Sequence, residues 1–180
     1  MDSSVLLMLF HPDVPPAQDP ATGRPVEKAR ERIELLVSGL SKARVQIVIP
    51  TPVLTELLYV SGPEISRVLS EINGAYAFVI APFDEKAAIE CALLVDGAGP
   101  SKKGRAKKKE ATTETKAKVK FDQQIIAIAK SNNIRTLYTD DGKLSDRAVL
   151  NGLSVVHTWD LPLPPVPPQG ELDYPPVDTE

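Results

Sequence analysis

The sequence has few of the residues that build covalent or metal cross-links, and it has no long apolar run. Its 180 residues include one cysteine, Cys91, and two histidines, which excludes an intramolecular disulfide framework and a usual structural zinc site. A lone cysteine fits the reducing cytosol, so we expect a cytoplasmic protein. No apolar run approaches the roughly 20 residues that cross a bilayer, and no basic segment precedes the first apolar run. We therefore expect neither contact with a membrane nor a signal peptide.

The overall charge is also small, at −3, and at first sight it argues against a nucleic-acid partner. The charge is unevenly distributed, because residues 101–120 carry nine basic and two acidic side chains, a net of +7, which leaves −10 for the remainder. A block of like charge predicts a solvated, mobile loop, and such a loop can also attract phosphates. The basic residues are Lys102, Lys103, Arg105, Lys107, Lys108, Lys109, Lys116, Lys118 and Lys120.

Proline is abundant, with 17 residues, and it is clustered. Five prolines between Pro12 and Pro25 indicate an irregular excursion early in the domain. Seven more between Pro162 and Pro176 predict an extended, disordered tail over 161–180, with a ligand for a proline-recognising domain as the alternative. The hydrophobic content of 42% suits one globular domain, which we place at residues 1–160 with a flexible basic insertion at about 97–118.

Short β-branched runs alternate with amphipathic segments of about ten residues, and this alternation predicts an α/β domain with a parallel sheet between helices. The expected helices are 5–10, 26–40, 51–60, 63–72, 84–94, 121–130 and 143–150, and the expected strands are 45–49, 76–80, 134–138 and 153–156. Such a domain normally opens with a strand, yet only Met1 precedes Asp2. The first strand is therefore missing or rudimentary, and we expect the natural gene product to be a few residues longer.

Acidic residues occur at four places in the chain, each of which follows a strand, begins a helix or lies within a helix. Asp2 heads the first helix and Asp122 heads the helix after the basic insertion, so either could simply favour a helix N-terminus. Asp140 and Asp141 follow a strand and precede Gly142, which also fits a plain turn. Glu56 is the sole charge in 52–60, and we expect it to be buried, or paired with a lysine at the rim.

Together these acids suggest a ligand site, because parallel strands gather their carboxyl ends at one edge of the sheet. Four carboxylates in one cleft repel one another unless cations neutralise them. Oxygen ligands without histidine or cysteine favour Mg²⁺ or Mn²⁺ over zinc. Such ions activate water and stabilise the charge that develops on phosphorus, so a site of this kind usually acts on phosphates.

Four segments carry a family resemblance: DSSVLL at 2–7, PTPVLTELL at 50–58, KFDQQIIAIAK at 120–130 and TLYTDDGKL at 136–144. In this order they resemble the acidic blocks of PIN-domain nucleases, of which VapC-like ribonucleases are examples. The resemblance implies a three-layer, Rossmann-like α/β fold with a central, mostly parallel sheet. It maps the catalytic and metal-binding acids of the family onto Asp2, Glu56, Asp122 and Asp141. Ser4, Thr139 and Asp140 would be supporting polar residues.

The resemblance also implies an activity, which is metal-dependent cleavage of single-stranded RNA with Mg²⁺ or Mn²⁺. The basic residues of 101–120 would then draw the RNA toward an acidic site. A toxin with an antitoxin partner, and a homodimer, follow from the family alone. The alternative is a catalytically idle PIN-like module that binds RNA or a protein.

Overall fold

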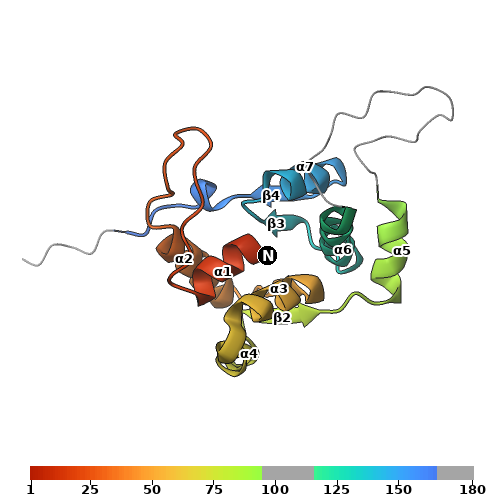
Figure 1. Cartoon of the computed structure of the whole chain (residues 1–180), viewed down its shortest axis with the longest axis horizontal. Coiled ribbons are helices and arrows are strands. Elements are labelled where there is room, and N and C mark those ends of the chain that lie inside the picture. Colours follow the sequence, from red (N-terminus) through yellow and green to blue (C-terminus); the bar gives the residue numbers. More distant parts are fainter. Residues whose placement is uncertain (95–115, 166–180) are drawn as a thin grey trace, which may run out of the picture.

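The computed structural model describes residues 1–94 and 116–165 (Figure 1). Over these ranges helices alternate with short strands, and no described helix has the length and apolar character needed to span a membrane. The elements are α1 (Ser3–Phe10), α2 (Ala29–Lys42), β1 (Ile47–Pro50), α3 (Thr51–Ser61), η1 (Gly62–Glu64), α4 (Ile65–Gly74), β2 (Phe78–Ala81), α5 (Glu85–Leu93), α6 (Lys116–Ser131), β3 (Thr136–Tyr138), α7 (Gly142–Leu150), β4 (Ser154–Val156) and η2 (Thr158–Asp160).

The strands form two separate parallel pairs. β1 pairs with β2, with Ile47 opposite Phe78, and β3 pairs with β4, with Thr136 opposite Ser154. This confirms an α/β domain with parallel strands. In the described ranges the two pairs are separate two-stranded sheets, so one central sheet is not seen there.

The first two residues lie between the two strand pairs. The Met1 amino group donates a hydrogen bond of 2.9 Å to the Val48 carbonyl of β1, and the Asp2 N–H donates one of 2.9 Å to the Tyr138 carbonyl of β3. Figure 1 shows this end of the chain between the β3–β4 pair and the α3–β2 region. Burial lowers the pKa of the Met1 amino group to about 6, although the Asp2 carboxylate opposes the shift.

Three helices lead into the following strand through the same kind of turn. In each, one residue with a positive φ follows the helix, and the next N–H bonds to the carbonyl five residues earlier, a Schellman-type ending. The chain therefore enters β1, β3 and β4 through the same local geometry, and α3 and α7 follow the carboxyl ends of β1 and β3. The turns use Arg44 (φ 56°) with a bond from Val45 to Leu40, Asn133 (φ 57°) with a bond from Ile134 to Ala129, and Gly152 (φ 83°) with a bond from Leu153 to Ala148.

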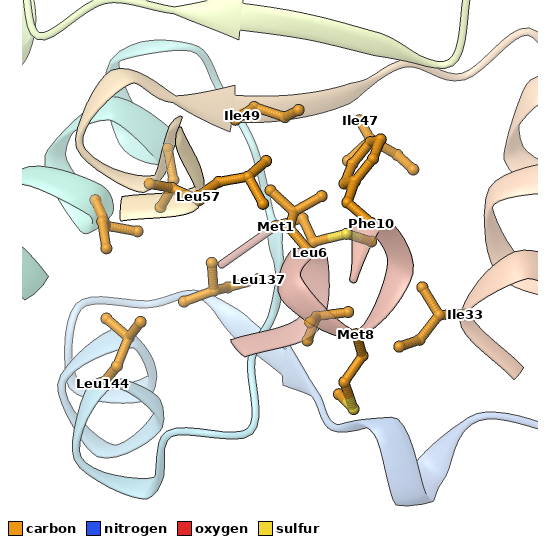
Figure 2. Close-up of a cluster of buried hydrophobic side chains, with 14 of the residues drawn as sticks. Met1, Leu6, Met8, Phe10, Ile33, Ile47, Ile49, Leu57, Leu137 and Leu144 are labelled. Carbon is orange, nitrogen blue, oxygen red and sulfur yellow. The ribbon is translucent and has the colours of Figure 1, made fainter. Parts of the chain in front are cut away.

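The main hydrophobic core surrounds α1, which is apolar on almost every side. Leu6 of α1 is fully buried, as are Ile33 of α2 and Leu57 of α3. Figure 2 shows Ile47 and Ile49 of β1 on one side of α1, and Leu137 of β3 and Leu144 of α7 on the other. Because buried residues of α1, β1, β3 and α7 belong to one cluster, both strand pairs share a single core with α1.

The limits predicted for the insertion and for the tail both differ from the structure. α6 begins at Lys116, so residues 116–118 are helical and do not belong to a flexible insertion. The reason is a row of Ala117, Phe121 and Ile125, four residues apart, along the face of α6 that borders a cleft, while the lysines between them obscured this periodicity. Leu161, the first residue of the expected tail, is buried in the core. Residues 97–115 of the expected insertion and 166–180 of the tail lie outside the described residues.

Candidate functional site

A cleft of about 540 Å³ lies where the start of α1, the helices α3 and α6, and the start of α7 meet. The structure brings the four predicted acids, Asp2, Glu56, Asp122 and Asp141, to the wall of this one cleft, although they come from four separate segments. The carboxyl ends of β1 and β3 lead directly to it, as expected for a ligand site between parallel strands. The remaining lining residues are Ser3, Thr55, Tyr59, Ala117, Lys118, Phe121, Ile125 and Leu144.

Asp2 occupies the N-cap position of α1, but its side chain does not cap the helix. The carboxylate is 4% exposed and accepts hydrogen bonds from the hydroxyls of Thr139, at 2.9 Å, and Ser4, at 3.1 Å. The simple helix-capping interpretation of this residue is therefore wrong. Its hydroxyl partners hold a buried carboxylate in one orientation beside the cleft.

Asp141 has two roles in the described structure. One carboxylate oxygen caps α7 by accepting hydrogen bonds from the N–H groups of Lys143, at 2.8 Å, and Leu144, at 3.1 Å. The other oxygen accepts a hydrogen bond of 2.6 Å from the Lys118 ammonium. Burial raises the pKa of the Asp141 carboxyl, but the Lys118 contact and the two backbone donors outweigh burial, and the net pKa is lowered.

Asp122 lies on α6, six residues after its first residue, Lys116, and not at its N-terminus as predicted. It is 5% exposed and forms an ion pair with Arg147 of α7. Burial raises the pKa of the Asp122 carboxyl to about 6, the Arg147 guanidinium opposes this, and the charge of Asp141 adds to it. A carboxyl with this pKa is half protonated near pH 6, so this part of the cleft resists holding a further negative charge without a cation.

The raised pKa of Asp122 predicts a pH-dependent stability in metal-free protein. Unfolded aspartate titrates near pH 3.9, so the folded state binds this proton more tightly and is favoured at low pH. Its contribution is complete below about pH 4 and is lost as the pH rises through about 6. Asparagine does not titrate, so the Asp122→Asn variant lacks this loss of stability. The thermal midpoint of the variant should therefore rise relative to that of the parent between pH 4.5 and pH 7. Equal pH slopes for the two proteins, measured with chelator, would contradict this.

Glu56 is exposed, which corrects the prediction that it is a buried carboxylate. The buried residues of α3 include Val53 and Leu57, whereas Glu56, Thr55 and Tyr59 lie on its open face. The apolar residues of that open face obscured the amphipathic pattern, because Tyr59 is 88% exposed. Because Glu56 is exposed, its carboxylate can contact a ligand in the cleft without first losing its hydration to burial in the protein.

The three predicted supporting residues adjoin Asp2 in the structure. Thr139 is fully buried, and its hydroxyl both donates to Asp2 and accepts from the Asp141 N–H at 3.1 Å. The Ser4 hydroxyl accepts from the Asp140 N–H at 3.1 Å, while the Asp140 carboxylate accepts from Thr158, at 2.7 Å from its N–H and 2.6 Å from its hydroxyl. The network therefore fixes Asp2 relative to Asp141 and directs Asp140 away toward Thr158.

The donor set of the cleft fits a hard divalent cation better than zinc, since every acidic ligand offers oxygen. Among the described residues, however, no three acidic, histidine or cysteine side chains gather closely enough to hold a metal ion. Lys118 and Arg147 instead neutralise Asp141 and Asp122. A metal could use these carboxylates once the two basic side chains move aside.

The predicted nucleic-acid-binding residues divide into two groups. Lys102, Lys103, Arg105, Lys107, Lys108 and Lys109 lie outside the described residues. Lys116, Lys118 and Lys120 belong to α6, where Lys120 is exposed and Lys118 reaches into the cleft. Part of the basic segment therefore contributes directly to the carboxylate site.

Sequence reasoning missed Arg147, Thr158 and Tyr59. Arg147 is six residues after Asp141, on a helix that looks ordinary, and its partner Asp122 is 25 residues away. Only the packing of α6 against α7 brings the two together. Tyr59 could have been identified from the sequence, since it is three residues after Glu56 and therefore lies on the same face of the helix.

No known family model matches the chain, and no curated protein matches it either.

Proposed function

We propose that this protein is a metal-dependent endoribonuclease of the PIN type, which cleaves single-stranded RNA in the carboxylate cleft. The observation that carries the proposal is the placement of Asp2, Glu56, Asp122 and Asp141 on one cleft wall. If the family resemblance were accidental, four segments between residues 2 and 144 would not be expected to meet at one place.

The acids would have distinct roles. Asp2, Asp122 and Asp141 would hold one or two Mg²⁺ or Mn²⁺ ions, and Glu56 would bind an ion directly or through water. The bound cation would activate water and stabilise charge on the phosphate. Thr139 would keep the Asp2 carboxylate oriented, since its hydroxyl contacts that carboxylate at 2.9 Å. The raised pKa of Asp122 gives a cation an electrostatic reason to bind there.

The same proposal includes the fold, which would be the three-layer arrangement of PIN domains. A three-layer PIN arrangement needs the β1–β2 and β3–β4 pairs to be parts of one central sheet. Two observations support it: both pairs are parallel, and the main chain of Met1 and Asp2 hydrogen-bonds to β1 on one side and β3 on the other.

Single-stranded RNA suits the walls of the cleft. Tyr59 offers a broad exposed ring on which a base can stack, and unpaired bases are free to use such a platform. Lys120 adds an exposed positive charge on α6, and the basic residues of 101–109 would attract phosphates from farther away. An antitoxin partner and a homodimer are proposed from the family resemblance alone.

The test is cleavage of an end-labelled single-stranded RNA by the purified chain with Mn²⁺ or Mg²⁺. We expect discrete internal cleavage products that a chelator abolishes. Asp141→Asn, purified in the same way, reports any contaminating ribonuclease and should be inactive. RNA binding without cleavage at any concentration of either metal would contradict the proposed activity.

Glu56→Gln should weaken cleavage less than changes at the buried acids. Because Glu56 is exposed, water can replace its carboxylate as a ligand, and we expect a loss of about 10-fold, within the range for indirect metal partners. Rates under single-turnover conditions measure the effect. A loss as large as that of Asp141→Asn would mean that Glu56 is a primary ligand.

Lys118→Met should tighten Mn²⁺ binding severalfold, because the metal would no longer displace an ammonium from Asp141. Calorimetric titration with Mn²⁺ measures the affinity. Lys120→Met removes the same charge from an exposed position on the same helix and serves as the matched control. Equal changes in both variants would assign the effect to general charge and not to the Lys118–Asp141 contact.

The second candidate function is a catalytically idle PIN-like module that binds RNA or a protein. The observation in its favour is the pairing of Asp122 with Arg147 and of Asp141 with Lys118, which gives both acids a cation from the protein itself. In that case Mn²⁺ would neither bind tightly nor raise the thermal midpoint, and RNA affinity would be unchanged in Asp122→Asn.

A further inference from the structure

A second cavity adjoins the carboxylate cleft and has no role in the proposed cleavage. It holds about 310 Å³ between α1, the loop after α1 and the segment after β4. We call it the aromatic pocket, because Trp159 is the one aromatic side chain among its lining residues. The other lining residues are Ser4, Leu7, Met8, Val14, Pro15, Ala17, Gln18 and Asp140. Apolar walls with a few polar groups are typical of a small-ligand site.

The aromatic pocket and the carboxylate cleft share two segments of the chain. At the start of α1, Ser3 lines the cleft and Ser4 lines the pocket. After β3, Asp141 lines the cleft and Asp140 lines the pocket. The Ser4 hydroxyl ties these segments together, since it donates to Asp2 and accepts from the Asp140 N–H, both at 3.1 Å. An RNA strand with a phosphate in the cleft can therefore place a neighbouring base in the aromatic pocket.

The ring of Trp159 is held in place by its neighbours. It stacks on the His157 ring with the centroids 4.3 Å apart and the planes 13° from parallel. His157 Nδ1 lies 2.6 Å from the Thr139 carbonyl, which can only accept, so the imidazole donates there. The Trp159 carbonyl accepts from Arg32 at 3.2 Å. Trp159 thus offers a fixed aromatic surface, on which a nucleobase can stack.

The polar groups of the aromatic pocket favour a base that donates hydrogen bonds. Asp140 is the one charged side chain among the lining residues, so a phosphate would be repelled. Its two carboxylate oxygens accept from the Thr158 N–H, at 2.7 Å, and from the Thr158 hydroxyl, at 2.6 Å. These bonds fix the carboxylate and leave each oxygen able to accept again. Guanine alone among the RNA bases presents two adjacent donors, N1–H and N2–H₂, on its Watson–Crick edge.

We propose that the aromatic pocket binds one guanine base of the RNA, stacked on Trp159, with its N1–H and N2–H₂ groups donating to the Asp140 carboxylate. This assignment rests on the proposed RNA substrate and makes the chain selective for guanine beside the cleavage position. It gives Asp140 a role of its own, separate from the acids of the cleft, and needs no metal ion for binding.

The fluorescence of Trp159 tests the proposal directly, because the chain has one tryptophan. The protein is titrated in chelator with the trinucleotides UpGpU, UpApU, UpCpU and UpUpU, so that no cleavage interferes. We expect UpGpU to quench the fluorescence and to bind about 10-fold more tightly than the others, the usual scale of discrimination by a bidentate contact. Equal affinities for the four trinucleotides would overturn the proposal.

Asp140→Asn separates the carboxylate from the ring. The variant keeps an oxygen that can accept from Thr158, but it places a donor where guanine also donates, so the guanine preference should disappear. Asp146→Asn removes the same charge from an exposed position on α7 outside both cavities and should keep the preference. A preference that survives Asp140→Asn, or that both variants lose equally, would overturn the proposal.

Trp159→Leu removes the stacking surface and should weaken binding of fluorescein-labelled UpGpU about 10-fold, within the range for one base stacked on an aromatic ring. Fluorescence anisotropy measures this affinity. Tyr76→Leu is the matched control, since Tyr76 is an exposed aromatic residue outside both cavities. Equal losses in the two variants would contradict a specific role for Trp159.

Failure of the guanine pocket and failure of the nuclease give different results. RNA cleavage by a chain whose Trp159 fluorescence does not distinguish the four trinucleotides would overturn the guanine pocket and leave the nuclease. Guanine-dependent quenching by a chain that cleaves no RNA with Mn²⁺ or Mg²⁺ would support the pocket and overturn the nuclease.

Discussion

Asp122→Asn should lower the rate of RNA cleavage by about 100-fold or more, which is the usual scale for losing one preorganised electrostatic group. The carboxylate is almost fully buried beside the cleft, so water cannot easily replace it as a ligand. The same variant should be at least as stable as the parent at pH 7 without metal, because burial already raises the pKa of Asp122 to about 6. Lost activity in a protein of undiminished stability is the expected signature of a functional acid.

Asp146→Asn is the matched control, since Asp146 is an exposed acid on α7 outside the cleft. It should retain the parental rate and the parental Mn²⁺ affinity. A rate unchanged in Asp122→Asn would remove this residue from the site. A large loss of stability in metal-free Asp122→Asn would instead mean that its ion pair with Arg147 is chiefly structural.

Leu6→Ala should reduce the free energy of unfolding by about 2–5 kcal/mol, the range for a large core side chain replaced by alanine. Leu6 is fully buried and belongs to α1, around which both strand pairs pack (Figure 2). Because α1 fills the space between the halves of the domain, neither half can close over the cavity without moving the other. Urea unfolding followed by circular dichroism measures the change.

Leu93→Ala supplies the comparison, because Leu93 is 69% exposed on α5 and should change stability by no more than about 0.5 kcal/mol. If Leu6→Ala proves too unstable to purify, Ile33→Val at another fully buried site should cost about 0.5–1.5 kcal/mol. Similar losses for Leu6→Ala and Leu93→Ala would show that α1 is not central to the core.

Much of the fold could be predicted from local patterns. The alternation of β-branched runs with amphipathic segments identified the described α-helices and the four strands, most of them to within a few residues. The start of α6 was missed because Lys116 and Lys118 resemble a solvated loop, whereas Ala117 and Phe121 lie on the face of α6 that lines the cleft. Strand pairing is a long-range property, so the separation into two pairs could not be read from any one segment.

The acids of the site could be predicted, but their partners could not. Asp2 and Asp141 were identified from their positions at helix starts and strand ends, which are local features. The Arg147–Asp122 and Lys118–Asp141 pairs join residues 25 and 23 positions apart and depend on how α6 packs. Glu56 was placed in the correct cleft with the wrong exposure, because an exposed tyrosine made its helix look buried on all sides.

The position of Met1 has a practical consequence for every experiment described above. Its amino group is buried and bonded to Val48, so an affinity tag or fluorophore attached there must thread between β1 and β3. Such a label would displace the Met1 contact with Val48 and alter the position of Asp2. Purification handles and dyes for the metal-binding and cleavage experiments are therefore better placed away from Met1.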